Sequence, residues 1–230
     1  MVIFPGGLQA DAVIFDFDGI IVDTEPLHHK AFQRILEPLG LGFSWQQYVD
    51  TYMGFDDRDA FIEAFASQNR PLDAATLASL VEQKARVFQT VIQDGITSYP
   101  GVVELITKLH QMQVPLAISS GALRSDIAPI VQQLDIAHCF DVIVTADDVT
   151  KSKPDPETYR LAFKKLASRT APLSPERTVA IEDTPAGISA AQGAGLQIIG
   201  VTNSYPKELL STATVVLDSL EKLIPFAVHP

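Results

Sequence analysis

Two aspartates stand two positions apart directly after an apolar run, and this pair is the feature of the chain best suited to chemistry. Asp16 and Asp18 follow the run 12–15, which has the composition of a buried strand. Because alternate side chains of a strand share a face, we expect both carboxylates to point into the same space. Neighbouring carboxylates repel, so the pair needs a cation, a shared proton or a chemical role. One carboxylate can attack phosphorus while the other transfers protons, and Gly19 allows a sharp turn after them.

Polar residues follow two later apolar runs. Ser119, Ser120 and Gly121 stand at the end of one run, where a hydroxyl and free backbone N–H groups suit a phosphate. A helix N-cap has the same composition and is the alternative.

Lys153 stands before the sequence P-D-P, and a lysine in a loop stiffened by proline can offset negative charge on the first aspartate or on a phosphoryl group.

Paired carboxylates also follow the apolar run 179–181. Glu182 and Asp183 offer oxygen ligands, which Mg²⁺ prefers in octahedral coordination. The structural alternative is that Asp183 or Thr184 caps a helix that has Pro185 at its first position. Both interpretations are compatible with each other.

Short apolar runs recur along the chain and alternate with stretches of helical period. This alternation predicts βαβ units, and therefore an α/β fold with a parallel sheet and helices on both faces. All four polar motifs then lie at the carboxyl ends of strands, where an open α/β sheet forms its ligand crevice. The predicted strands are 12–15, 115–118, 142–144, 179–181, 198–201 and 215–217, and the helices between them include 101–112 and 156–166.

The first gap between strands breaks this rhythm. From Glu25 to about Gly95 the sequence shows helical patterns and no convincing strand, with Pro26 and Gly95 near the ends as hinge signals. We predict an all-helical module at residues 25–95, inserted into an α/β core formed by residues 1–24 and 96–230. Its predicted helices are 27–39, 44–52, 58–67 and 74–93, with Ser44 and Asp57 as N-caps and Gly40 as a helix stop.

Residues 16–25 read D-F-D-G-I-I-V-D-T-E, and this string resembles the nucleophile loop of the haloacid dehalogenase superfamily. It looks most like the branch that holds β-phosphoglucomutases and phosphoglycolate-type phosphatases. The later motifs occur in the order that this superfamily requires, and the resemblance covers nearly the whole chain. It implies a Rossmann-like parallel sheet, a helical cap domain that closes over the active site, and phosphoryl transfer through an aspartyl-phosphate.

The resemblance also implies roles for individual residues. Asp16 is then the nucleophile, and Asp18 protonates the leaving oxygen and later activates water. Ser119 matches the phosphate-binding hydroxyl and Lys153 the charge-balancing lysine. Mg²⁺ is the implied cofactor, and its expected ligands are Asp16, Asp18 through its backbone carbonyl, Glu182 and Asp183. The expected substrate-binding residues are Thr24, His28, Ser120, Gly121 and Arg58.

The core motifs do not separate a phosphatase from a phosphomutase. A mutase of the β-phosphoglucomutase type resembles this chain but has Ser-Lys where Gly121-Ala122 stand here. Its cap also has an arginine three residues after a glycine, whereas Arg58 comes one place late after Gly54. Arg58 or Arg124 could compensate. The comparison favours a phosphatase that acts on small phosphate monoesters and leaves the phosphomutase as the alternative.

A non-catalytic binding protein on this fold is a further alternative, but every catalytic position is filled. The stretch 52–58 is the expected determinant of specificity in the cap. Its acidic residues Asp56 and Asp57 argue against a second anionic group, so phosphosugars or phosphorylated alcohols are expected, while phosphoglycolate would need a partner such as Arg58.

Composition limits the classes of partner. The chain has 230 residues, a formal net charge of -11 and a sequence pI of about 4.8, with no clustered basic stretch, so we expect no nucleic acid partner. No stretch approaches the length of a membrane span, and the first residues lack the basic start of a signal segment. Cys139 is the single cysteine and is expected to be a buried apolar residue. We therefore expect a cytoplasmic monomer without a membrane partner.

Overall fold

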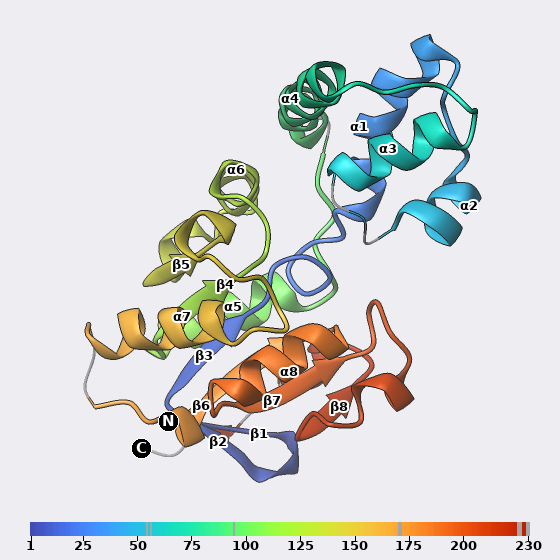
Figure 1. The fold of residues 1–230 in the computed structure, drawn as a ribbon. Coiled ribbons are helices and arrows are strands. Elements are labelled where there is room, and N and C mark those ends of the chain that lie inside the picture. Colours follow the sequence, from blue (N-terminus) through green and yellow to red (C-terminus); the bar gives the residue numbers. More distant parts are fainter. Residues whose placement is uncertain (54, 56, 94, 170–171, 225–226, 229–230) are drawn as a thin grey trace. The chain divides into compact units, whose positions relative to one another are not determined.

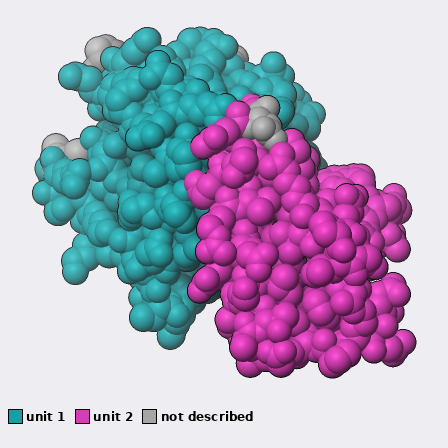
Figure 2. All heavy atoms as spheres, turned by 90° about the horizontal axis from the view of Figure 1, so that it is seen from above, with its two compact units in different colours: residues 1–23, 97–230 teal, residues 24–96 magenta. Residues whose placement is uncertain are grey.

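The computed structural model describes residues 1–53, 55, 57–93, 95–169, 172–224 and 227–228. The chain divides into two compact units, which Figure 2 colours separately. Unit 1 consists of residues 1–23 and 97–230, and unit 2 consists of residues 24–96. Unit 1 combines strands and helices, whereas the described residues of unit 2 form helices and loops alone.

A parallel sheet of six strands forms the centre of unit 1 (Figure 1). Its order is β5-β4-β3-β6-β7-β8, and every neighbouring pair is parallel. The strands lie where the apolar runs predict them, so the α/β fold class is confirmed. Their bounds are β3 Ala12–Phe15, β4 Leu116–Ser119, β5 Val142–Val144, β6 Thr178–Glu182, β7 Gln197–Val201 and β8 Val215–Leu217.

Helices cover both faces of this sheet because its central strands are buried on both sides. Their bounds are α5 Val102–Gln111, α6 Arg124–Gln133, α7 Glu157–Ala167 and α8 Pro185–Gly193. Helices α7 and α8 lie on one face, and α5 lies on the other (Figure 1). All four residues of β3 are fully buried, which is why this strand is a continuous apolar run rather than an alternating one.

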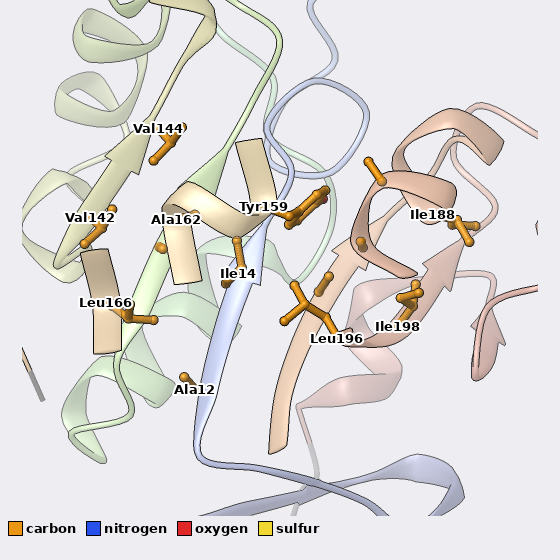
Figure 3. Packing of buried hydrophobic residues seen from close by; sticks show 14 of the residues in the cluster. Ala12, Ile14, Val142, Val144, Tyr159, Ala162, Leu166, Ile188, Leu196 and Ile198 are labelled. Carbon is orange, nitrogen blue, oxygen red and sulfur yellow. The ribbon is translucent and has the colours of Figure 1, made fainter. Parts of the chain in front are cut away.

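Side chains from α7, α8 and the strands interlock on one face of the sheet (Figure 3). Ile14 of β3 and Ile198 of β7 point toward this layer, together with Leu166 of α7 and Ile188 of α8. Each of these four residues is at most 1% exposed to solvent. The packing fixes α7 against the sheet, and α7 in turn carries Tyr159, whose ring lies in the same layer.

The strand order brings the chain's polar motifs together at the carboxyl ends of the central strands. From β3 the chain passes to β4 and β5 on one side, and then to β6, β7 and β8 on the other. The direction of the order therefore reverses around β3, and an open α/β sheet has its crevice at such a reversal, beyond the carboxyl ends of the strands. Asp16 directly follows β3, and Glu182 ends the adjacent β6.

A small antiparallel sheet near the amino terminus was not predicted from the sequence. It contains β1 Val2–Phe4, β2 Leu8–Ala10 and β9 Ala227–Val228, in the order β2-β1-β9. Each strand has at most three residues, which is too short for a periodic pattern to show. A short turn with Gly6 and Gly7 at positive φ connects the first two strands.

Unit 2 contains helices close to those predicted. Their bounds are α1 Glu25–Leu36, α2 Trp45–Gln47, α3 Asp57–Ala66 and α4 Ala74–Gln93. Ser44 caps α2 and Gly40 ends the turn after α1 at positive φ, as expected. The helix predicted for 44–52 is confirmed as a helical segment, but it widens after α2 into a π-helical turn at Tyr48–Tyr52, which the sequence did not indicate. Asp57 is not an N-cap, since it is the first residue inside α3.

Unit 2 has an aromatic core of its own. Phe32 of α1 packs edge to face against Phe61 of α3, and Phe43 stacks on Tyr52 with ring centroids 4.1 Å apart. All four rings are buried. A separate core of this kind is consistent with a compact unit that packs around its own residues. Among the described residues, no helix has both the length and the apolar composition that a membrane crossing requires.

Candidate active site

Three motifs that are far apart in the sequence meet around the ammonium group of Lys153. Its Nζ donates to Asp16 Oδ1 at 2.7 Å, to Glu182 Oε1 at 2.6 Å and to the backbone oxygen of Ser119 at 3.1 Å. The lysine therefore links the carboxyl ends of β3, β4 and β6. Its side chain is only 13% exposed, and it lies between two carboxylates that are less exposed still.

Glu182 is completely buried and is held by hydrogen bonds at both oxygens. Oε1 accepts from Lys153 and from the hydroxyl of Tyr159 at 2.8 Å. Oε2 accepts from the backbone N–H of Asp183 and from the backbone and hydroxyl of Thr184 at 3.1–3.3 Å. The hydroxyl of Thr184 also caps α8, which has Pro185 at its start, so the predicted helix cap is confirmed. These bonds fix one orientation of the carboxylate.

Two buried oxygen atoms in this region have no hydrogen-bond partner among the described residues. They are the hydroxyl of Ser119 and Oδ1 of Asp183. The other oxygen of Asp183 accepts from the hydroxyl of Ser204. Because buried polar atoms nearly always have partners, unpartnered oxygens beside a cluster of charges indicate a place for a bound group. Ser119 is therefore not the helix N-cap that its sequence also allowed.

The carboxylates of Asp16, Glu182 and Asp183 form a group that can hold a metal ion. One oxygen from each lies within 4.8 Å of the others, and all three residues are buried. Oxygen ligands with this much negative charge suit a hard divalent cation. The unpartnered oxygen of Asp183 belongs to this group, so the residues present fit such an ion.

Burial shifts the pKa values of the charged groups in this cluster. It raises the pKa of Asp16 well above its ordinary value, and the charge of Glu182 raises that pKa further. Burial lowers the pKa of Lys153, but the two adjacent carboxylates outweigh this effect and the pKa rises. Burial also raises the pKa of Asp183 to about 7, against the opposing effect of the Ser204 hydrogen bond. The cluster therefore favours uptake of a proton or a cation.

The loop after β3 turns sharply at Gly19 and approaches Asp183. Gly19 has φ +79°, and a Cβ atom there would overlap the carboxylate of Asp183. Asn203 Nδ2 donates to the backbone oxygen of Gly19 at 2.6 Å, and the Gly19 N–H donates to Val22 at 2.9 Å. Glycine is thus required both by the left-handed backbone and by the approach of the carboxylate.

We expect Gly19→Ala to lower the free energy of unfolding by roughly 2–4 kcal/mol, since strain and overlap add. Gly7→Ala is a matched control, because Gly7 has a similar φ of +76° and nothing within 4 Å of its added Cβ. The control should cost about 1–2 kcal/mol. Urea unfolding of both variants measures the difference, and equal losses would mean that Asp183 does not approach this turn.

The structure places the other residues predicted in unit 1 close to these motifs. Strand β3 ends at Phe15, so Asp16 and Asp18 lie in the loop beyond it. Strand alternation therefore ends just before the two aspartates, and their shared direction stays a prediction. Asp18 is half-buried. Ser120 is buried, its hydroxyl accepts from the N–H of Ala122 at 2.9 Å, and Gly121 is exposed.

The structure gives Arg124 a different role from the one that a mutase would need. Its Nη2 donates to Asp148 at 2.6 Å and to the backbone oxygen of Ile143 on the edge strand β5 at 3.1 Å. The guanidinium charge is thus paired beside the sheet edge. In this structure Arg124 is therefore engaged by Asp148 and not free as a lone cation.

Three predicted substrate-binding residues belong to unit 2. Thr24 is buried and precedes α1, and its backbone oxygen accepts from His28 at 2.9 Å. Arg58 is exposed on α3. In the expected specificity stretch 52–58, residues 54 and 56 lie outside the described residues.

His28 forms a partly buried cluster with Lys84 of α4. Lys84 Nζ lies 2.7 Å from His28 Nδ1 and 2.7 Å from Asp57 Oδ1, and the histidine ring stacks on Phe88 with centroids 4.4 Å apart. Lys84 is only 3% exposed. Burial, followed by the charge of Lys84, lowers the pKa of His28 to about 3. The imidazole is therefore neutral at physiological pH, and Asp57 is used as an ion-pair partner instead of a cap.

Sequence reasoning missed several residues that hold the cluster in unit 1. Asn203 and Ser204 come shortly after β7. A search for polar residues at the carboxyl ends of predicted strands, which located the other motifs, could also have located these two. Tyr159 had no such signal, because an aromatic residue in an amphipathic helix is usually a core residue. In unit 2, Lys84 falls on the buried face of α4, where a lysine is not expected.

Known proteins resemble this chain along most of its length. Residues 13–201 match the family described as "Haloacid dehalogenase-like hydrolase". The phosphorylated carbohydrates phosphatase of Thermotoga maritima is 31% identical over 218 residues, 93% of this chain and 96% of that protein. Fructose-1-phosphate phosphatase YqaB of Escherichia coli K12 is 30% identical over 190 residues, 82% of this chain and 95% of that protein. A mutant of CbbY from Rhodobacter sphaeroides, solved with xylulose-1,5-bisphosphate, has a TM-score of 0.78 at 27% identity, covering 93% of this chain and 96% of that one.

Proposed function

Because the chain belongs to the haloacid dehalogenase-like hydrolases, we propose that it is a Mg²⁺-dependent phosphatase acting on small phosphorylated sugars. The observation that carries the proposal is the buried cluster of Lys153, Asp16 and Glu182, with the unpartnered oxygens of Ser119 and Asp183 beside it. It combines a nucleophile, a balancing charge and donors for a phosphate. Phosphoryl transfer depends on this kind of positioning and charge compensation.

The substrate class is supported by the relatives. One is named a phosphatase of phosphorylated carbohydrates, and another a phosphatase of fructose 1-phosphate. We propose that a monophosphorylated sugar or polyol is the substrate here, because the sequence lacks the Ser-Lys pair expected of the mutase branch. A mutase also needs a cation for the second phosphate of its intermediate, and the pairing of Arg124 with Asp148 supports a hydrolase for that reason.

In the proposed reaction, Asp16 attacks the phosphorus atom in line with the leaving sugar oxygen. The P–O bond to the sugar breaks, and Asp18 transfers its proton to that oxygen. Lys153 holds the nucleophilic carboxylate through Oδ1 and balances the charge of the phosphoryl group. Asp18 then accepts a proton from a water molecule that attacks the aspartyl-phosphate, which releases inorganic phosphate and restores Asp16.

The acidic group is proposed to hold Mg²⁺ through Asp16, Asp183, Glu182 and the backbone carbonyl of Asp18. When bound, Mg²⁺ supplies positive charge that favours the ionised carboxylates and offsets the charge of the transferred group. This charge is needed because burial raises the pKa of Asp16, which must be ionised to act as a nucleophile. The hydroxyl of Ser119 and nearby backbone N–H groups are proposed to bind the phosphate oxygens.

We propose that unit 2 is a cap, formed by about residues 25–95, which excludes bulk water and selects the sugar. His28 and Arg58 are its proposed contributors to substrate binding, together with Thr24 at its boundary and with Ser120 and Gly121 from unit 1. We also propose that the protein acts as a monomer in the cytoplasm, with no nucleic acid or membrane partner. These assignments follow from the sequence motifs and the acidic composition.

Mg²⁺ affinity is expected to fall as the pH drops below about 7. The folded-state pKa of Asp183 is about 7, so protons and Mg²⁺ compete for the same carboxylate in this range. Binding at about pH 6 should be about tenfold weaker than at about pH 8. Calorimetric titration with Mg²⁺ at the two pH values measures the ratio. Equal affinities would exclude Asp183 as the titrating ligand.

Phosphate release from a panel of monoesters tests the proposed function. The panel contains hexose and pentose phosphates, polyol phosphates and phosphoglycolate, each with and without Mg²⁺. We expect Mg²⁺-dependent release that is fastest with a sugar or polyol phosphate. Absence of release from the whole panel, together with interconversion of β-glucose 1-phosphate when a bisphosphate primer is added, would favour the phosphomutase.

A further inference from the structure

Nitrogen and sulfur ligands from two segments meet beyond the amino ends of the strands of the parallel sheet. The carboxylates of Asp16, Glu182 and Asp183 lie beyond the opposite, carboxyl ends. His110 lies in the last turn of α5, and His138 and Cys139 lie in the short 3₁₀ turn before β5. We propose that these three side chains form a second metal site, which binds a borderline transition-metal ion of the Zn²⁺ type. The site is separate from the active site in both position and chemistry.

The distances between the donor atoms fit such an ion. One ligand atom from each of the three residues lies within 4.8 Å of the others. Cys139 Sγ lies 3.6 Å from His138 Nε2. Typical Zn–S and Zn–N bonds at a tetrahedral angle require a sulfur–nitrogen separation of about 3.6 Å. This pair therefore already has the spacing of two ligands to one ion.

The second ring nitrogen of His138 faces a fully exposed carboxylate that lies beyond direct hydrogen-bonding distance. Its Nδ1 lies 4.0 Å from Asp135 Oδ1. A small rotation of this exposed carboxylate would let it accept a hydrogen bond from Nδ1, which would leave Nε2, the nitrogen that faces Cys139, to bind a metal. Asp135 would therefore orient the imidazole without binding the ion directly.

The local backbone presents the three donors from rigid positions. The N–H of Gln113 donates to the backbone oxygen of His110 at 2.8 Å, which closes the turn after α5. The N–H of Cys139 donates to Ile136 at 3.0 Å, which holds the 3₁₀ turn. The rings of His110 and His138 are perpendicular, with centroids 5.4 Å apart. A small rotation of the exposed His110 side chain would bring its donor closer to the other two.

Exposure gives an ion a route into the site. His110 and His138 are exposed, while Cys139 is buried beneath them. The cysteine is buried as the sequence predicts, but the fold also supplies two imidazoles that are not obvious from spacing, because His110 is far from Cys139 in the sequence. On binding, the thiol proton passes to solvent and the thiolate bonds to the ion. A water molecule can complete a fourth position.

The ligand chemistry separates this site from the proposed Mg²⁺ site. Imidazole and thiolate select Zn²⁺, Co²⁺ and similar ions, whereas carboxylates suit Mg²⁺. The sheet geometry separates them in space. His110 and Cys139 come before β4 and β5, while Asp16 and Glu182 lie at the carboxyl ends of β3 and β6. Because the strands are parallel, the first set lies beyond the amino ends of the strands and the second set lies beyond their carboxyl ends.

Titration of the full chain with Co²⁺ in excess Mg²⁺ tests this site directly. We expect one equivalent to bind with a thiolate-to-cobalt charge-transfer band and the intense visible spectrum of tetrahedral Co²⁺, both lost on addition of Zn²⁺. His138→Asn and His110→Asn should each weaken binding by about 10–100-fold or more. Asp135→Asn should weaken it by about tenfold, since it acts through His138.

His29→Asn is the matched control, because it removes an imidazole of unit 2 that packs against Phe43 and Tyr48 and is not part of the proposed site. It should leave the spectrum unchanged. The histidine variants test the proposal even if Cys139→Ala does not fold, because their side chains are exposed. Absence of a charge-transfer band in the folded protein would overturn the proposal. Unchanged affinity in both His110→Asn and His138→Asn would do the same, since the ion would then bind elsewhere.

Discussion

Asp16→Asn is expected to reduce phosphate release by about 10³-fold or more while leaving the fold intact. The change removes the proposed nucleophile, and an amide oxygen does not form the aspartyl-phosphate. The fold should persist because Lys153 still pairs with Glu182 at 2.6 Å after the charge of Asp16 is lost. Steady-state kinetics with the best substrate of the panel, together with circular dichroism and urea unfolding, measure the two effects.

Glu182→Gln is the comparison that isolates the nucleophile. It removes an equal charge from the same lysine but keeps the carboxylate of Asp16. We expect it to retain measurable turnover with a weaker response to Mg²⁺. If Asp16→Asn is no slower than Glu182→Gln, the two carboxylates contribute only charge, and Asp16 is not the nucleophile.

Lys153→Met is expected to destabilise unit 1 as well as to abolish turnover. It leaves Asp16 and Glu182 buried without their shared cation, and breaking a buried ion pair costs about 3–5 kcal/mol. The loss should be largest at high pH. Burial raises the pKa of Asp16 and Asp183 in the folded state, so their protonation favours folding.

The direction of this pH dependence follows from the folded and unfolded pKa values. The contribution of a raised carboxyl pKa is fully present below the unfolded value of about 3.9 and is lost as the pH rises through the folded value. For Asp183 the folded value is about 7 with Lys153 in place, and loss of the lysine charge raises this pKa further. The Lys153→Met variant should therefore lose stability from about pH 4 to above about pH 7. Urea unfolding across this range, without Mg²⁺, measures the slope.

Lys84→Met provides a matched control in unit 2. Lys84 is also a buried lysine, but its partner Asp57 is 32% exposed and can be solvated when the lysine is lost. The control should therefore cost less than Lys153→Met and should show a weaker dependence on pH. Equal costs for the two substitutions would mean that the carboxylates around Lys153 are no more isolated from water than Asp57.

The parallel sheet could be predicted because its strands are buried on both faces and therefore read as continuous apolar runs. The acidic and hydroxyl motifs could be located for the same reason, since each follows such a run. To predict that the motifs meet, it was then enough to know that the strands are parallel, because parallel strands have their carboxyl ends on the same side of the sheet. The contact of Lys153 with Asp16 is consistent with this reasoning, because a loop after β5 reaches the end of β3.

Other features depend on tertiary contacts that have no local pattern. The hydroxyl of Tyr159 reaches Glu182 from α7, yet its ring packs in the core like any aromatic residue. The ion pair of Lys84 with Asp57 joins α4 to α3, and it replaces the cap that the sequence suggested. The strands β1 and β9 pair across nearly the whole length of the chain, and each is too short to show alternation.

Trapping of a phosphorylated enzyme tests the central claim most directly. The wild-type protein is mixed with Mg²⁺ and its best substrate, quenched in acid during turnover, digested and analysed by mass spectrometry. We predict a phosphoryl group that is labile to base and maps to Asp16, and its absence from the Asp16→Asn variant. A stable phosphoryl group on another residue would contradict the account, as would rapid turnover by the Asp16→Asn variant without any phosphorylated enzyme.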